Sequence, residues 1–196
     1  MRATAASEPR PCGPQGRGAL AAVARTGAQA SRRLVYMATL GKAAGVAGAF
    51  VAGPAVLVEW LLQKTRSYTF ATAAPAMLAE GVRAALRVFR DEPARLAQLH
   101  RNIAQFRAGV PAAIAGTAWT LLPSATAVQA LVIGSNEDAL RAMNALADAG
   151  LWVPAIRPPT VPEGTARLRI ALSAAHTPGD VDALLQGLAA AARTAR

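Results

Sequence analysis

The strongest constraint on the fold is an alternation of strand and helix patterns that begins after Pro111. The clearest strand pattern has a period of two, which places Leu168, Ile170 and Leu172 on one face and two arginines on the other. Strands are expected at 128–133, 151–156 and 167–172. Because a helix-start signal follows the first and the third of these segments, the pattern predicts an α/β layer.

Two capping signals predict where helices of this layer begin. Ser135 is followed three residues later by Asp138, a capping pattern for a helix that ends at Gly150. Thr177 and Asp180 repeat the pattern, with a proline at the first helical position. Helices are therefore expected after the first and third strands of the layer.

The first half of the chain predicts helices beside a small pair of strands. Lys42 is expected on the turn between the two strands, and Pro54 opens a helix whose apolar residues fall on most sides. We therefore expect this helix to be buried on most of its surface. The strands are expected at 33–37 and 45–52, and further helices at 75–90 and 92–108, the last of which could link two domains.

The formal net charge of +10 does not by itself indicate a nucleic-acid partner. Residues 1–35 hold six arginines against Glu8, and the remaining basic residues are scattered singly. The sequence contains no block of basic residues interleaved with aromatics, so a nucleic-acid groove is not expected. A single cysteine, Cys12, excludes an internal disulfide and a cysteine metal cage, and suits a reducing, cytoplasmic location.

A membrane span and a targeting peptide are also not expected. The apolar run at 43–58 is interrupted by glycines and Pro54 and ended by Glu59, so it does not predict a spanning helix. Residues 1–15 are basic, as some transit peptides are, but they contain prolines and lack an apolar region. We interpret them as an unstructured leader.

Lys42 is one of only two lysines in a chain with nineteen arginines, and it raises three alternatives. The first is a solvated lysine on a surface turn. The second is a cofactor lysine that forms a Schiff base with an aldehyde, with the Thr39 hydroxyl three residues earlier binding a phosphate. The third is a nucleotide phosphate loop, which is disfavoured because alanine, not serine or threonine, follows Lys42.

Three further features have both a structural and a functional interpretation. The proline-rich loop 157–162 is either a rigid connector or a loop that presents the Thr160 hydroxyl. The strand arginines, including Arg169, are either solvated or placed to bind a carboxylate in bidentate fashion. His100 and His176 have no acidic partner at a spacing that indicates a triad or a metal site, so structural roles are expected.

Four ordered segments give the sequence a family resemblance. They begin at residues 13, 34, 70 and 151 and read GPQGRGAL, LVYMATLGKAAGVAGAFVAG, FATAAPA and LWVPAIRPPTVPEGTARLRIALSAAHT. In this order they resemble the C-terminal half of the pyridoxal-phosphate-dependent α-oxoamine synthases. The IRPPTVP segment at 156–162 is similar to the 8-amino-7-oxononanoate synthases within that family.

The resemblance implies a fold, a reaction and a set of site residues. The fold is the C-terminal part of a fold-type-I pyridoxal-phosphate transferase, and the reaction is the decarboxylative condensation of L-alanine with pimeloyl-CoA or a pimeloyl-carrier protein in biotin biosynthesis, on a homodimer. Lys42 would hold pyridoxal 5'-phosphate and shuttle the α-proton, while Thr39 binds the cofactor phosphate. Thr72 would reach that phosphate across the dimer interface, Thr160 would contact substrate, and Arg169 would bind the amino-acid carboxylate.

The same resemblance implies an organisation into parts. A remnant of the cofactor-binding large domain is expected at 16–95, and a complete small α/β domain at 96–196. The family's Asp-x-x-His segment is expected just before Gly13 and is not found there, so the sequence corresponds to about half of such an enzyme. Another α-oxoamine synthase, using glycine or serine, and a truncated, inactive fragment are the alternative hypotheses.

Overall fold

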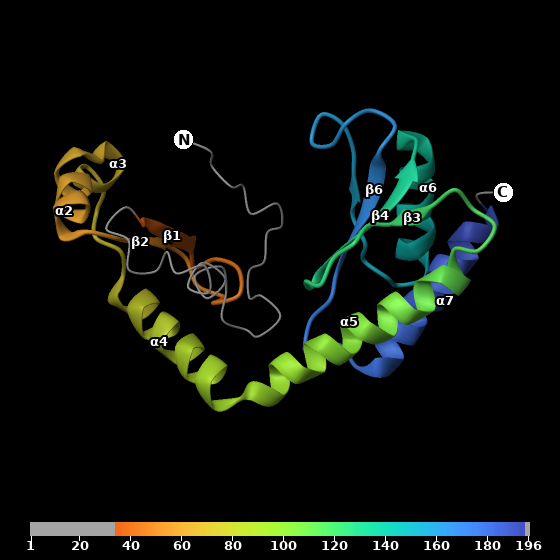
Figure 1. Ribbon diagram of the computed structural model, residues 1–196, viewed down its shortest axis with the longest axis horizontal. Coiled ribbons are helices and arrows are strands. Elements are labelled where there is room, and N and C mark those ends of the chain that lie inside the picture. The colour runs from red at the N-terminus through yellow and green to blue at the C-terminus, as the bar shows by residue number, and fades with distance from the viewer. Residues whose placement is uncertain (1–33, 195–196) are drawn as a thin grey trace. The chain divides into compact units, whose positions relative to one another are not determined.

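The computed structural model describes residues 34–194 (Figure 1). Contacts divide the chain into two compact units, Met1–Pro93 and Ala94–Arg196, which are described separately below. The leader expected at 1–15 lies outside the described residues, as does the rest of the chain up to residue 33.

The N-terminal unit contains a two-stranded antiparallel hairpin. Strand β1 (Tyr36–Thr39) pairs with β2 (Ala49–Ala52), with Tyr36 opposite Ala52 and Thr39 opposite Ala49. Both strands were expected, and the turn between them carries Lys42 as predicted. The second strand begins four residues later than predicted, because Gly45 and Gly48 adopt φ values of +66° and +112° that no regular strand contains.

Three helices complete the described part of this unit: α2 (Ala55–Lys64), α3 (Arg66–Thr69) and α4 (Ala76–Asp91). Helices α2 and α4 each follow a proline, as predicted, whereas α3 was not predicted. The expectation that α2 is buried was wrong, since Val56 is 83% exposed and Trp60 56% exposed. No described residue of this unit is buried, so the apolar sides of α2 have too few neighbours to cover them.

The C-terminal unit is built on a four-stranded antiparallel sheet of order β3-β4-β6-β5. Its strands are β3 (Thr120–Leu121), β4 (Val128–Gly134), β5 (Ala155–Ile156) and β6 (Ala166–Ala171). The three predicted strands are present, and the two-residue β3 was not predicted. Strand β5 is shorter than expected because Pro154 has no N–H for the ladder, although its carbonyl accepts a bond from the Arg169 N–H at 2.9 Å.

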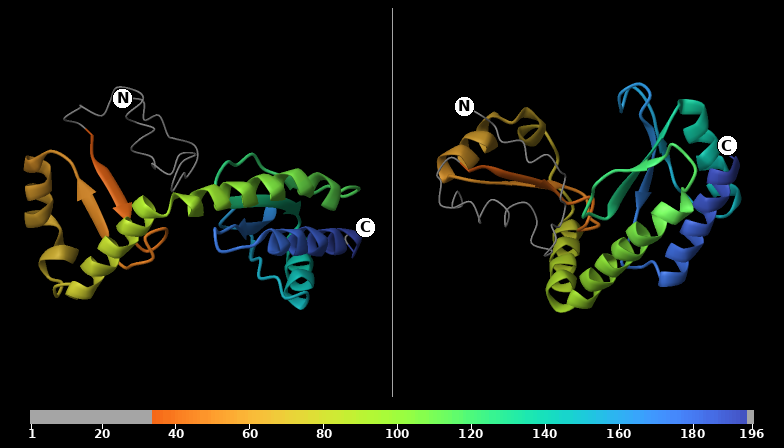
Figure 2. Two further views of the ribbon diagram at one scale, coloured as in Figure 1. Left: turned by 90° about the horizontal axis from the view of Figure 1, so that it is seen from below. Right: turned by 45° about the vertical axis from the view of Figure 1, so that its right-hand side comes forward.

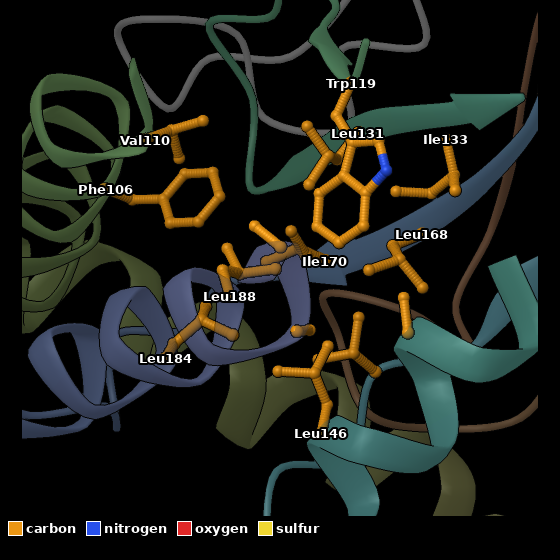
Figure 3. Packing of buried hydrophobic residues seen from close by; sticks show 14 of the residues in the cluster. Phe106, Val110, Trp119, Leu131, Ile133, Leu146, Leu168, Ile170, Leu184 and Leu188 are labelled. Carbon is orange, nitrogen blue, oxygen red and sulfur yellow. The ribbon is translucent and has the colours of Figure 1, made fainter. Parts of the chain in front are cut away.

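Three helices pack with this sheet: α5 (Pro93–Ala113), α6 (Asn136–Asp148) and α7 (Pro178–Thr194). Side chains from α5, α6, α7 and alternate residues of β4 and β6 meet in one core, whose best buried members include Phe106, Leu131, Leu168 and Leu188 (Figure 3). The period of two in β6 is confirmed, since Leu168 and Ile170 are buried. One face of the sheet is thereby covered, and Arg167 and Arg169 lie on the other.

Both predicted helix caps are present in this unit. The Ser135 hydroxyl accepts a bond from the Asp138 N–H at 3.0 Å, at the start of α6. At the start of α7 the Thr177 hydroxyl accepts from the Asp180 N–H at 3.2 Å, and the Asp180 carboxylate accepts from the Thr177 N–H at 2.7 Å. The local sequence therefore determines where these two helices begin.

Candidate functional site

The loop that carries Lys42 is closed by its own backbone. The Leu40 N–H donates to the Gly48 carbonyl at 2.8 Å, and the Val46 N–H donates to the Leu40 carbonyl at 3.0 Å. A third bond, from the Gly45 N–H to the Lys42 carbonyl at 2.9 Å, forms the turn after Lys42. These bonds fix the backbone of Lys42, while its side chain is exposed and makes no ion pair or hydrogen bond with any described residue.

Thr39 is the last residue of β1 and leads directly into this loop. Residues of β1 alternate between half-buried and exposed, and Thr39 lies on the exposed face. Its hydroxyl makes no hydrogen bond to the described residues. Thr39 at the end of β1 and Lys42 in the loop are thus three residues apart in the sequence, and the side chains of both are exposed.

Thr72 lies in the same unit, in the segment between α3 and α4, and is exposed. Within the described range its side chain is hydrogen-bonded neither to Thr39 nor to Lys42. Its predicted action across a dimer interface stays a prediction.

The two arginines of β6 differ in their hydrogen bonds. The guanidinium of Arg167 donates from Nε to the Thr165 carbonyl at 3.0 Å and from Nη2 to the Thr165 hydroxyl at 2.9 Å. Arg169 is exposed, and its guanidinium has no partner between residues 34 and 194. It stands opposite Ala130 of β4, whose side chain is small. Arg169 is therefore the arginine of this strand that is free to bind an anion.

Thr160 lies in the loop between β5 and β6. Its backbone N–H donates to the Arg157 carbonyl at 3.1 Å, which closes a turn, and its side chain is exposed. Thr160 and Arg169 are therefore carried by the same β5–β6 hairpin.

Two buried polar residues of the C-terminal unit were not predicted. Asn102 of α5 is fully buried and donates from Nδ2 to the carbonyls of Ser173 and His176, at 3.0 and 2.8 Å. Gln129 of β4 is also fully buried and accepts a bond from Arg107 Nη1 at 2.7 Å. Asn102 stands directly before Ile103 on the buried face of α5, and no pattern in the sequence marked it.

The structure gives His176 a structural contact, as expected. His176 Nδ1 accepts a bond from the Ser173 N–H at 3.2 Å, which holds the turn before α7, and His100 is half-buried. Residues 34–194 contain no cluster of three metal-ligating side chains. None of the helices formed by these residues has both the length and the apolar character needed to cross a membrane.

Comparison with known proteins gives one family and several close relatives. Residues 14–188 match the aminotransferase class I and II family. The 8-amino-7-oxononanoate synthase of Paracidovorax citrulli (strain AAC00-1) is 66% identical over 184 residues, which are 94% of this chain and 45% of the relative. The synthase of Delftia acidovorans is 64% identical over 183 residues, which are 93% of this chain and 45% of the relative. The chain spans about half the length of the curated relatives it matches.

Solved structures give the same picture of the fold. A structure described as SPT with a PLP internal aldimine is 27% identical, with a TM-score of 0.80, over 93% of this chain and 44% of its own. A serine palmitoyltransferase variant from S. paucimobilis with a bound PLP–myriocin aldimine is 26% identical, with a TM-score of 0.78, over the same shares. The 8-amino-7-oxononanoate synthase of Francisella tularensis, at 24% identity and a TM-score of 0.70, covers 82% of this chain and 46% of its own and shows likeness of fold alone.

Proposed function

The chain belongs to the aminotransferase class I and II family, and we propose that it provides the C-terminal half of an 8-amino-7-oxononanoate synthase. The reaction is the decarboxylative condensation of L-alanine with a pimeloyl thioester, with pyridoxal phosphate as cofactor. The observation that carries the proposal is the 66% identity to a named synthase over 94% of the chain. The serine palmitoyltransferase structures share the fold at 26–27% identity, so serine is the less supported substrate.

The fold predicted from the sequence is confirmed by these relatives. They include pyridoxal-phosphate enzymes of the same fold, and they match this chain over less than half of their own length. The resemblance to the C-terminal half of the 8-amino-7-oxononanoate synthases is confirmed as well.

The residues of the Lys42 loop fit pyridoxal phosphate. Formation of a Schiff base with the cofactor aldehyde requires a primary amine. Lys42 presents such an amine to solvent on a loop closed by backbone hydrogen bonds. A phosphate oxygen accepts hydrogen bonds from hydroxyl groups, and Thr39 presents a hydroxyl at the end of β1, directly before the loop. The cofactor, when bound, supplies an electron sink for the carbanion of the amino acid. We assign to Lys42 Nζ both the covalent attachment and the movement of the α-proton.

The substrate residues belong to the C-terminal unit. Arg169 binds the carboxylate of L-alanine, since its guanidinium is exposed while that of Arg167 is engaged with Thr165. Thr160 contacts the substrate from the β5–β6 loop. In a homodimer, the Thr72 hydroxyl binds the cofactor phosphate held by the second copy.

Reductive labelling tests the cofactor assignment on the 196-residue chain itself. The chain is incubated with pyridoxal phosphate and reduced with borohydride, and the labelled lysines are quantified by peptide mass spectrometry. We expect Lys42 to be labelled well above Lys64, because Lys42 alone has the Thr39 hydroxyl beside it to bind the phosphate. Equal labelling of the two lysines would refute the assignment.

Two controls isolate the contribution of the phosphate. Pyridoxal, which has the aldehyde but no phosphate, should show a smaller preference for Lys42 over Lys64. The Thr39→Val variant should reduce the preference seen with pyridoxal phosphate to the level seen with pyridoxal. A Thr39→Val variant that keeps the full preference would assign the phosphate to other residues.

A further inference from the structure

Helix α4 lies close to the Lys42 loop at Gly81. A methyl group placed on the Cα of Gly81 would lie 3.3 Å from Cγ2 and 3.6 Å from Cγ1 of Val46. Val46 belongs to the loop between β1 and β2, four residues after Lys42, and Figure 2 shows this loop beside α4 in both views. A side chain at residue 81 would therefore contact Val46 more tightly than ordinary van der Waals packing, so Val46 would have to shift by a few tenths of an ångström.

The contact lies on the half-buried face of α4. The half-buried residues of α4 fall on one face, and Gly81 lies within it; they are Leu78, Gly81, Val82 and Ala85. On the loop, Leu40, Ala44 and Val46 are half-buried, whereas Lys42 is exposed. The loop therefore has an inner side toward its own unit and an outer side that carries the amine.

Val46 is linked by a backbone hydrogen bond to Leu40, two residues before Lys42. Its N–H donates to the Leu40 carbonyl at 3.0 Å, and Leu40 in turn donates to Gly48 at 2.8 Å, so these bonds close the loop on both sides of Lys42. A side chain at residue 81 that displaced the backbone of Val46 would therefore strain the hydrogen bonds that close the loop. The helix is the stiffer partner, because every residue around Gly81 is helical.

We propose that Gly81 is a positioning residue for Lys42: the absence of a side chain there lets α4 seat Val46 and so sets the place of the amine beside Thr39. The effect of Gly81 on cofactor binding rests on the proposed function, whereas its packing against Val46 does not. It makes Gly81 and Val46 a size-matched pair, in which a larger residue at 81 is tolerated only with a smaller one at 46.

The test uses amide hydrogen exchange of the peptide that spans 40–48 in the 196-residue chain without cofactor. Gly81→Ala should speed exchange of the Leu40 and Val46 amides by about fivefold, because overpacking opposes closure of the loop. If Gly81 served only the helix, alanine would strengthen α4 and leave exchange unchanged or slower. Unchanged or slower exchange would overturn the proposal.

A double-mutant cycle identifies Val46 as the partner. In the Val46→Ala background, Gly81→Ala should have no further effect on exchange. A Gly81→Ala effect of the same size in both backgrounds would overturn the pairing. Ala84→Leu, on the exposed face of α4, is the matched control for added bulk and should leave the loop amides unchanged.

Labelling then connects the position of the loop to the proposed function. The preference of pyridoxal phosphate for Lys42 over Lys64 should fall about fivefold in Gly81→Ala and recover when Val46→Ala is added. If the unaltered chain shows no preference, the proposed function fails, while the exchange result still decides whether Gly81 positions the loop. If exchange responds as expected but the preference does not fall, Gly81 does not position Lys42 for the cofactor.

Discussion

Replacing Asn102 by alanine should destabilise the C-terminal unit by about 2–4 kcal/mol. The amide is fully buried and forms three hydrogen bonds: it donates to the Ser173 and His176 carbonyls and accepts from Gln98 Nε2 at 2.8 Å. Each buried polar group left without a partner costs about 1–3 kcal/mol. Because Ser173 is exposed, its carbonyl can bond to water in the variant. The expected loss of stability is therefore smaller than for two fully buried carbonyls.

The assay follows the core of this unit alone. Trp119 is 7% exposed and lies in the core (Figure 3), whereas Trp60 and Trp152 are exposed. With Trp60 and Trp152 replaced by phenylalanine, urea unfolding monitored by Trp119 fluorescence reports the C-terminal unit. The measured quantity is the free energy of unfolding extrapolated to water, with and without the Asn102→Ala change.

Two further variants separate the hydrogen bonds from the cavity. Asn102→Asp preserves the volume but points an oxygen at the two carbonyls, so it should destabilise at least as much as Asn102→Ala. Gln98→Ala removes one of the three bonds at a half-buried position and should cost less than about 1 kcal/mol. An Asn102→Asp variant as stable as the parent would refute the reasoning, because donation by Nδ2 would then contribute nothing.

Two other predictions concern the same unit. A methyl group added at Gly109 of α5 would clash with Leu185 of α7, so Gly109→Ala should lower stability by about 1–3 kcal/mol despite a gain in helix propensity; a higher urea midpoint would contradict this. The backbone N–H and then the hydroxyl of Thr177 hold the pKa of the Asp180 carboxyl below its ordinary value. A lowered folded-state pKa gives stability that is present above about pH 4 and is lost as the pH falls through the folded value, so Asp180→Asn should flatten the acid dependence of the urea midpoint. An unchanged slope between about pH 6 and pH 3 would show that this cap does not titrate with folding.

Features set by neighbouring residues were predictable from the sequence. The caps at Ser135 and Thr177 join residues three positions apart, and the strand 167–172 needed only its own period of two. The turn at Lys42 followed from the strand patterns on either side of it. In each case the information lies within one element, where hydrophobic period and capping chemistry act.

Features set by distant residues were not predictable. The two carbonyls to which Asn102 donates are 71 and 74 residues away, so its importance could not be predicted from α5 alone. The pattern of α2 indicated burial on several sides, but the described residues of its unit supply no such cover. A hydrophobic pattern indicates which side chains favour burial. Whether other residues cover them depends on the tertiary structure.

The family resemblance selected the site residues, and the structure adds a physical reason for choosing between residues of one type. Arg167 and Arg169 lie on the same face of β6, and nothing in a period of two distinguishes them. Their hydrogen bonds do, since Thr165 engages Arg167 and leaves Arg169 to solvent. Lys42 follows the same logic, because its loop uses backbone groups for closure and leaves the amine unengaged. A side chain already satisfied by its own fold must lose those bonds before it can bind a ligand, so the unengaged residue on a fixed backbone is the better prepared one.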